Sequence, residues 1–171
     1  SKGSGKWEKS SGETSKFGLT TSEVLGALRM LDESNLNDKL KMLHFHIGSQ
    51  VPDIFTVKKA VQEASRYYAK LYKMGFPIRW FDVGGGLGVD YDGSRSKSDS
   101  SKNYSLQEYA NDVVYHVAEV SNGEGVPHPE IISESGRTIV AHHSVLVVEA
   151  IGRVTKGRTL ENITYGEKEH D

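Results

Sequence analysis

Three short segments carry the residues best suited to chemistry, and each follows an apolar stretch of the chain. They are 46–49 (His-Ile-Gly-Ser), 84–86 (Gly-Gly-Gly) and 134–137 (Glu-Ser-Gly-Arg). Glycines let a backbone approach an anion closely and turn its N–H groups toward it. The hydroxyl of Ser49 and the positive end of a helix behind Arg137 would add donors. We therefore predict that the three segments together bind an anionic group, of which a phosphate is the simplest.

Each segment also has a purely structural interpretation. Gly84 to Gly86 could form no more than a tight turn. A dinucleotide pattern Gly-x-Gly-x-x-Gly is excluded there, because position 89 is Val89. Glu134 could simply pair with Arg137 at the surface. The recurrence of three such segments, rather than any one of them, favours a binding site.

Two histidines, His44 and His46, lie two residues apart and project to the same side of an extended strand. One interpretation is a metal pair, with His142 and His143 as further ligands. For His44 we favour a packed, hydrogen-bonded side chain. His46 sits at the end of the strand beside Ser49, where a flat ring facing a flat ligand is the more attractive hypothesis.

The hydrophobic pattern predicts alternating helices and strands that would position these residues. Helices are expected at about 22–33, after Asp53, after Ser105 and, as a short turn, up to Ala141; strands are expected at 40–47, 78–83 and 130–133, with a β-rich run at 144–154. Capping boxes mark two of the helix starts, at 20–23 and 105–108. This order is typical of βαβ units and predicts a parallel sheet covered by helices. Because ligands of such folds bind at the carboxyl ends of the strands, the three segments should meet there.

The composition narrows the class of protein. The chain has 171 residues, which suits one domain or a piece of a larger one. Its 21 Lys and Arg residues against 23 Asp and Glu residues give a net charge of −2 and argue against a nucleic-acid partner. The absence of cysteine excludes disulfides and thiolate metal sites. Without a long apolar run or an apolar leader, we expect no membrane partner and a cytoplasmic location.

In their order and spacing, the three segments resemble the barrel of the fold-type III pyridoxal-phosphate decarboxylases. Longer stretches resemble the biosynthetic arginine decarboxylases within that family: 5–7, 15–18, 43–50, 81–91, 93–96, 103–104 and 108–111. Diaminopimelate and ornithine decarboxylases share the three short motifs but not the loop 89–95 (Val-Asp-Tyr-Asp-Gly-Ser-Arg). The resemblance extends over residues 1–154.

The resemblance implies an α/β fold that forms the second half of a (β/α)8 TIM-type barrel, with the first strand of a C-terminal β-domain. It divides the chain into a partial cofactor-binding barrel (1–143), a crossing strand (144–155) and a polar tail (156–171). It puts the family's Schiff-base lysine before residue 1 and its remaining catalytic residues after the crossing strand. Lys16 is the nearest lysine by position, but it belongs to a different element. We therefore expect a fragment of a longer enzyme that is inactive when isolated.

Residue roles follow from the resemblance. His46 would stack on the ring of pyridoxal 5′-phosphate, and Glu134 would bind the pyridine nitrogen, so these two are the expected catalytic residues. A racemase on a similar barrel has an arginine at that nitrogen, so Glu134 favours a decarboxylase. The phosphate would be bound by Ser49, Gly84, Gly85, Gly86, Gly136 and Arg137.

The substrate pocket would include the segment after the second strand. Its residues are Phe81, Asp82, Val83, Gly84, Gly85, Gly86, Leu87, Gly88, Val89, Asp90 and Tyr91. Asp90 or Asp92 could bind a guanidinium by paired hydrogen bonds.

The resemblance thus implies decarboxylation of L-arginine to agmatine and CO₂ in polyamine biosynthesis, by a homo-oligomer. It also implies Mg²⁺, although no ligand cluster for this ion is evident in the sequence. Two alternatives stay open: another fold-type III decarboxylase of the diaminopimelate or ornithine type, and a non-catalytic α/β module that binds a phosphate or a cofactor.

Overall fold

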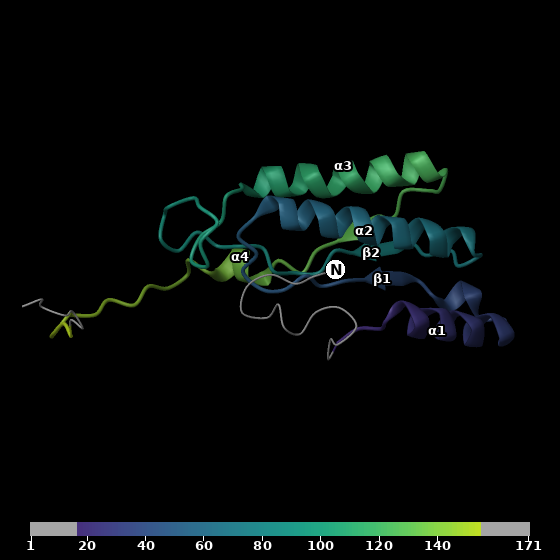
Figure 1. Cartoon of the computed structure of the whole chain (residues 1–171), viewed down its shortest axis with the longest axis horizontal. Helices are drawn as coiled ribbons and strands as arrows, with labels where there is room; N and C mark the ends of the chain where they lie inside the picture. The colour runs from purple at the N-terminus through teal and green to yellow at the C-terminus, as the bar shows by residue number, and fades with distance from the viewer. Residues whose placement is uncertain (1–16, 155–171) are drawn as a thin grey trace, which may run out of the picture.

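The computed structural model describes residues 17–154, which form a small parallel sheet with helices packed along it (Figure 1). The elements in chain order are α1 (Thr21–Glu33), the 3-10 helix η3 (Asn37–Lys39), β1 (Met42–His44), α2 (Ile54–Lys73), β2 (Trp80–Asp82), α3 (Leu106–Glu124), β3 (Glu130–Ile132) and α4 (Gly136–Val140). The strands lie in the order β1-β2-β3, and both pairs are parallel. The expected α/β class and the expected parallel sheet are therefore confirmed.

The helices begin where their capping residues predict. Thr20 accepts a hydrogen bond from the Glu23 amide, while the Glu23 carboxylate accepts one from the Thr20 amide. Ser105 and Glu108 make the same reciprocal pair at the start of α3. In each box, hydrogen bonds from the cap hold the pKa of the glutamate below its usual range. Both predicted boxes are confirmed.

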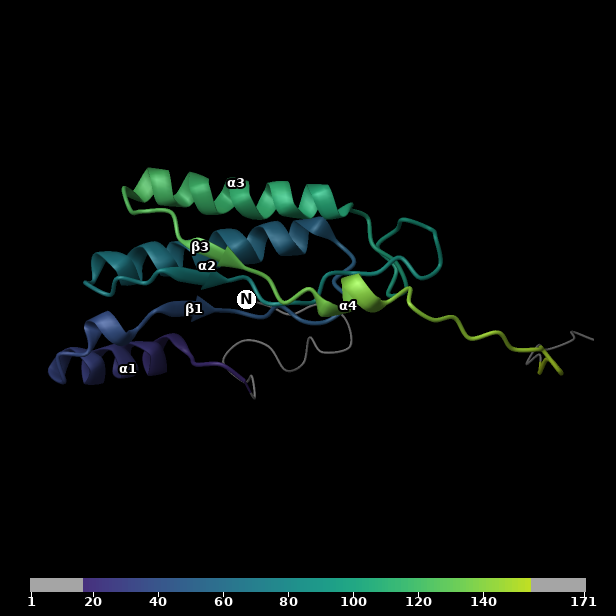
Figure 2. The same ribbon diagram turned by 180° about the vertical axis from the view of Figure 1, so that it is seen from behind.

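The core lies between the sheet and the pair of helices α2 and α3, which run side by side in Figures 1 and 2. The apolar side chains that recur along α2 at helical spacing are buried, with Tyr68 only 1% exposed. The Tyr68 ring contacts that of Phe81 in β2, with their centroids 6.1 Å apart. Its hydroxyl donates to the carbonyl of Pro127 at 2.7 Å, so the buried hydroxyl of Tyr68 is hydrogen-bonded.

The packing of Phe81 fixes which face each strand presents. Because strand side chains alternate, a Phe81 that points toward α2 places Asp82 on the opposite face. The register pairs His44 with Asp82 and Asp82 with Ile132. His44 and Asp82 thus share the face of the sheet that α2 does not cover.

The expected strand at 144–154 does not form. This segment has no β partner, and its six large apolar side chains are 75–96% exposed: Val145, Leu146, Val147, Val148, Ile151 and Val154. A high β propensity does not make a strand unless a neighbouring backbone accepts its hydrogen bonds. The domain limits at 143 and 155 stay predictions, and the segments 1–16 and 156–171 lie outside the described residues.

No helix among residues 17–154 has the length and apolar character needed to cross a membrane.

Candidate functional site

The carboxyl ends of the three strands open onto one cavity of about 210 Å³. It is lined by His46, Ser49, Gly85, Gly86, Leu87, Glu134, Ser135, Arg137 and Thr138. The structure therefore brings together the three segments that the sequence singled out. Of the expected cofactor ligands, only Gly84 and Gly136 do not line the cavity.

Backbone hydrogen bonds beyond the strand ends hold the cavity walls together. The Glu134 amide donates to the carbonyl of Gly84 at 2.9 Å, and the Val51 amide donates to that of Gly86 at 2.9 Å. A parallel bridge joins Val51 to Leu87. The loop after β2 is thus fixed to the loops on either side of it.

The glycines are required by this close packing. Gly84 and Gly86 have φ angles of 68° and 93°, a region that other residues adopt at a cost. A Cβ at Gly86 would collide with the carbonyl oxygen of Gly48, and one at Gly85 would lie 2.6 Å from the carbonyl oxygen of Glu134. The glycines therefore do more than make a turn, because they let three backbones meet at the cavity.

His46 and Glu134 reach the cavity from opposite edges of the sheet, at the ends of β1 and β3. The ring of His46 is exposed, and its Nδ1 lies 3.4 Å from the Gly85 amide, from which it accepts a long hydrogen bond. In the described part of the chain, no ion pair or hydrogen bond joins Glu134 to Arg137, so the simple surface pairing considered above is wrong.

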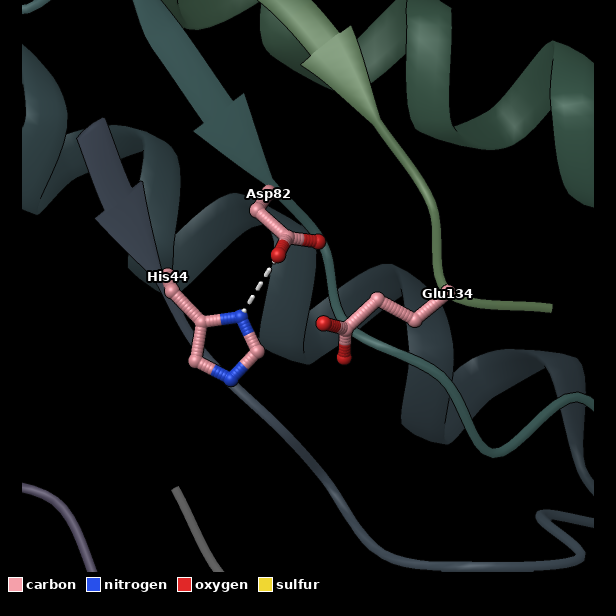
Figure 3. A group of neighbouring side chains, drawn as sticks. All are labelled: His44, Asp82 and Glu134. Carbon is pink, nitrogen blue, oxygen red and sulfur yellow. Dashed lines mark hydrogen bonds and ion pairs between the residues drawn. The ribbon is translucent and has the colours of Figure 1, made fainter. Parts of the chain in front are cut away.

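A second group of polar side chains lies beside the cavity (Figure 3). His44 Nδ1 is 2.9 Å from an oxygen of Asp82, and the other Asp82 oxygen accepts from the Gly84 amide at 2.9 Å. One polar atom each of His44, Asp82 and Glu134 lies within 4.8 Å of the other two. Figure 3 shows the Glu134 carboxylate turned toward the His44–Asp82 pair.

The environment of His44 differs from both interpretations of the sequence, a metal pair with His46 and a packed, hydrogen-bonded side chain. His44 is hydrogen-bonded as expected, but its side chain is 43% exposed rather than packed. Its neighbours are two carboxylates, and neither His46, His142 nor His143 belongs to this group. Sequence reasoning missed the grouping because its members lie on three different strand ends.

The segment 81–91 reaches the cavity only in part. Phe81, Val83 and Val89 are buried in the interior, whereas Leu87 lines the cavity. Asp82 is 4% exposed and has both oxygens hydrogen-bonded. Direct contact of this whole segment with a substrate remains a prediction.

The two acidic candidates for guanidinium binding differ in their partners. Asp90 accepts the hydroxyl of Ser101 at 2.6 Å through one oxygen. Asp92 accepts the amide of Ser94 through one oxygen and the hydroxyl of Ser98 through the other. Hydrogen bonds from Ser94 lower the pKa of Asp92 below its usual range. Asp92 is therefore already engaged within its own loop, and Asp90 is less so.

Sequence reasoning missed two residues that line the cavity, Ser135 and Thr138. The Thr138 Oγ1 atom is buried and has no hydrogen-bond partner. Their spacing of three residues, at the start of an expected helix, was the available signal, because it puts both on one side of a helix.

A parallel sheet with a glycine-lined polar cavity at the carboxyl ends of its strands is the arrangement of α/β proteins that bind phosphorylated ligands. Comparison with known proteins gives the particular family. Residues 1–141 match the model of the pyridoxal-dependent decarboxylases, pyridoxal binding domain. The chain belongs to this family.

Curated relatives are similar over nearly the whole chain. The biosynthetic arginine decarboxylase of Phocaeicola vulgatus is 52% identical over 172 residues, which include 100% of this chain and 27% of that protein. The enzyme of the same name from Rhodopirellula baltica is 56% identical over 156 residues, with 91% and 23% covered. The chain thus spans about a quarter of the length of these relatives.

Solved structures give the same grouping. The biosynthetic arginine decarboxylase of Campylobacter jejuni has a TM-score of 0.66 at 42% identity, with 72% of this chain and 21% of that one covered. A diaminopimelate decarboxylase of Helicobacter pylori, solved with L-lysine, has a TM-score of 0.57 at 28% identity, with 74% and 28% covered.

Proposed function

We propose that this chain is the cofactor-binding part of an arginine decarboxylase that uses pyridoxal 5′-phosphate to convert L-arginine to agmatine and CO₂ in polyamine biosynthesis. The observation that carries the proposal is the single cavity at the three strand ends, lined by His46, Ser49, Glu134 and Arg137. Relatives that are 50–56% identical and bear this name support arginine as the substrate. The three parallel strands with their helices would be part of a (β/α)8 barrel.

The lining residues fit a phosphorylated ring. Ser49, Ser135 and Thr138 offer hydroxyls and Arg137 a guanidinium, the donors that a phosphate requires. The buried, unpartnered Oγ1 of Thr138 is a donor that a bound phosphate oxygen would satisfy. Gly85 and Gly86 also line the cavity, and a Cβ at either position would collide with the backbone of a neighbouring loop.

When bound at this cavity, the cofactor would supply an electron-withdrawing ring, which is the chemistry that loss of CO₂ requires. Glu134 holds a proton at the ring nitrogen. Its carboxylate has no hydrogen bond to another described side chain, so it is free to accept an N–H. A charge-assisted hydrogen bond of this kind is stronger than a neutral one and keeps the ring protonated.

His46 orients the ring. Its imidazole is exposed at the cavity and held loosely by the Gly85 amide. A flat side chain at this place supports a flat ligand by stacking and excludes water from one side of it. Ser49, from the same loop, would bind the phosphate together with Gly85, Gly86 and Arg137, which also line the cavity. Gly84, whose amide is bound to Asp82, and Gly136 stay predictions from the resemblance.

Replacement of Glu134 by Gln tests the proposal in the complete protein. Agmatine formation should fall by about 100-fold or more, because a neutral amide does not hold a proton at the ring nitrogen. Cofactor binding, followed by fluorescence, should persist. An unchanged rate would refute the role of Glu134. Release of CO₂ from ornithine, lysine or diaminopimelate in preference to arginine would favour another decarboxylase of the family.

Three further parts of the proposal are a requirement for Mg²⁺ and assembly into a homo-oligomer, which come from the resemblance alone, and a cytoplasmic location, which comes from the composition of the sequence. Activity after chelation and after re-addition of Mg²⁺ tests the first. Light scattering of the complete protein tests the second, and fractionation of cells tests the third.

A further inference from the structure

We infer that Asp82 is a positioning residue that sets the Glu134 carboxylate for the ring nitrogen. The inference rests on the proposed function. It assigns Asp82 a role through another residue, in place of direct contact with the substrate. Asp82 does not line the cavity, and it is 4% exposed.

Asp82 holds two neighbours at once. One carboxylate oxygen meets His44 Nδ1 at 2.9 Å, and the other accepts the Gly84 amide at 2.9 Å. The parallel register places His44 directly opposite Asp82, so the imidazole needs no displacement of the backbone to reach it. A buried carboxylate with both oxygens engaged has a fixed orientation.

Gly84, which is hydrogen-bonded to Asp82, is in turn hydrogen-bonded to the backbone of Glu134. The Gly84 carbonyl accepts the Glu134 amide at 2.9 Å, while the Gly84 amide is bound to Asp82. Gly84 is therefore fixed on both sides, despite a φ of 68° that would otherwise leave a flexible point. The backbone from which the Glu134 side chain projects depends on this anchor.

The charges of Asp82 and Glu134 also favour binding of a cationic group by Glu134. Oxygens of Asp82 and Glu134 lie within 4.8 Å of each other, and a His44 nitrogen lies within the same distance of both (Figure 3). Two carboxylates at this separation repel, and a cation that both can approach is stabilised. The arrangement favours a Glu134 side chain that binds a protonated ring nitrogen on its cavity side, with Asp82 held behind it by its contact with His44.

The test compares the affinity of the complete apo-protein for pyridoxal 5′-phosphate with its affinity for the 1-deaza analogue, in which a CH group replaces the ring nitrogen. The wild-type protein should prefer the natural cofactor. Glu134→Gln should abolish this preference. Asp82→Asn retains an oxygen for the Gly84 amide but lacks the charge, so the preference should fall by about 3- to 30-fold, which lies within the range of couplings between contacting residues.

Asp82→Ala, which also removes the acceptor for Gly84, should reduce the preference further. His44→Phe should reduce it through loss of the imidazole. Asp38→Asn, at an exposed aspartate in η3, is the matched control and should leave it unchanged. A purely structural role of Asp82 would weaken both ligands equally and leave the ratio as in the wild-type protein.

The outcomes separate the two proposals. If the wild-type protein and Glu134→Gln show the same ratio, the proposed role of Glu134 fails. If Glu134→Gln loses the preference but Asp82→Asn and His44→Phe both keep it, the inference about Asp82 is overturned and the proposed function stands. If Asp82→Ala does not fold, Asp82→Asn decides.

Discussion

The side-chain amide of Gln50 pairs with both backbone groups of Val89. Its Nε2 donates to the Val89 carbonyl at 2.6 Å, and its Oε1 accepts the Val89 amide at 2.9 Å. The amide thus serves in place of a neighbouring strand and fixes the start of the polar loop 90–104 to the loop after β1. Gln50 itself has a φ of 53°, which is uncommon for a residue other than glycine.

Replacing Gln50 by Ala should therefore loosen the loop. We expect faster amide exchange at Val89 and a loss of about 1–3 kcal/mol in the free energy of unfolding, because a partly buried site loses the two hydrogen bonds to Val89 and a longer one to the Ser101 carbonyl. If the segment 81–91 forms part of the substrate pocket, KM for arginine should rise more than kcat falls. Hydrogen exchange measures the amide protection at Val89, and steady-state kinetics measure KM and kcat. If the Val89 amide is as well protected in the variant as in the wild type, Gln50 does not hold the loop in place.

The glycines at the cavity allow a matched pair of substitutions. Gly86→Ala should cost about 2–4 kcal/mol, because its φ is positive and its Cβ would meet the Gly48 carbonyl oxygen. Gly123→Ala, in α3 with open space around it, should be neutral or stabilising by about 0.5–1 kcal/mol. Denaturant unfolding of both variants gives the comparison. Equal costs at the two positions would show that the close packing of the loops is not what requires Gly86.

Thr138 should separate binding from stability. Because its Oγ1 has no partner, Thr138→Val removes no hydrogen bond from the protein and should leave the unfolding free energy within about 0.5 kcal/mol. Its affinity for pyridoxal 5′-phosphate should fall about fivefold, the worth of one hydrogen bond of about 1 kcal/mol. Thr138→Ser, which keeps the hydroxyl, is the control. Unchanged affinity in the valine variant would remove Thr138 from the phosphate site.

The acidic residues of the loop should differ in their effect on arginine. Asp90→Asn should lower kcat/KM for arginine by about 10- to 100-fold if a charge-assisted pair with the guanidinium is lost. Asp92→Asn should have a smaller effect, because both oxygens of Asp92 already serve its own loop. Kinetics with arginine and ornithine decide between them. A larger effect at Asp92 would reverse the assignment.

Glu130, at the end of the sheet away from the cavity, should make a pH-dependent contribution to the free energy of unfolding. Hydrogen bonds from Arg79 and Trp80 hold its pKa below the usual range. A carboxylate with a lowered pKa in the folded state adds stability above its unfolded pKa of about 4.3, and this is lost as the pH falls through the lower folded value. Arg79→Ala should return the pKa of Glu130 toward its usual value, as an NMR titration would detect. The effect on unfolding should be small because the pair is exposed.

The local structure of this chain follows from its sequence. Capping boxes, the apolar stripe of α2 and the order of helices and strands depend on contacts within a few residues, so the helix starts and the parallel α/β class were predictable. The three strand-end segments were also recognisable, since a glycine-rich turn after an apolar run needs no distant partner.

The tertiary structure decided what those segments do to one another. His44 and Asp82 are 38 residues apart, and only the register of β1 against β2 makes them hydrogen-bonded neighbours of Glu134. The collision that a side chain at Gly86 would cause depends on a carbonyl from another loop, which no local pattern reveals. The exposed apolar run at 144–154 shows that β propensity alone does not decide where a strand forms. A strand forms only where another backbone is available to pair with it.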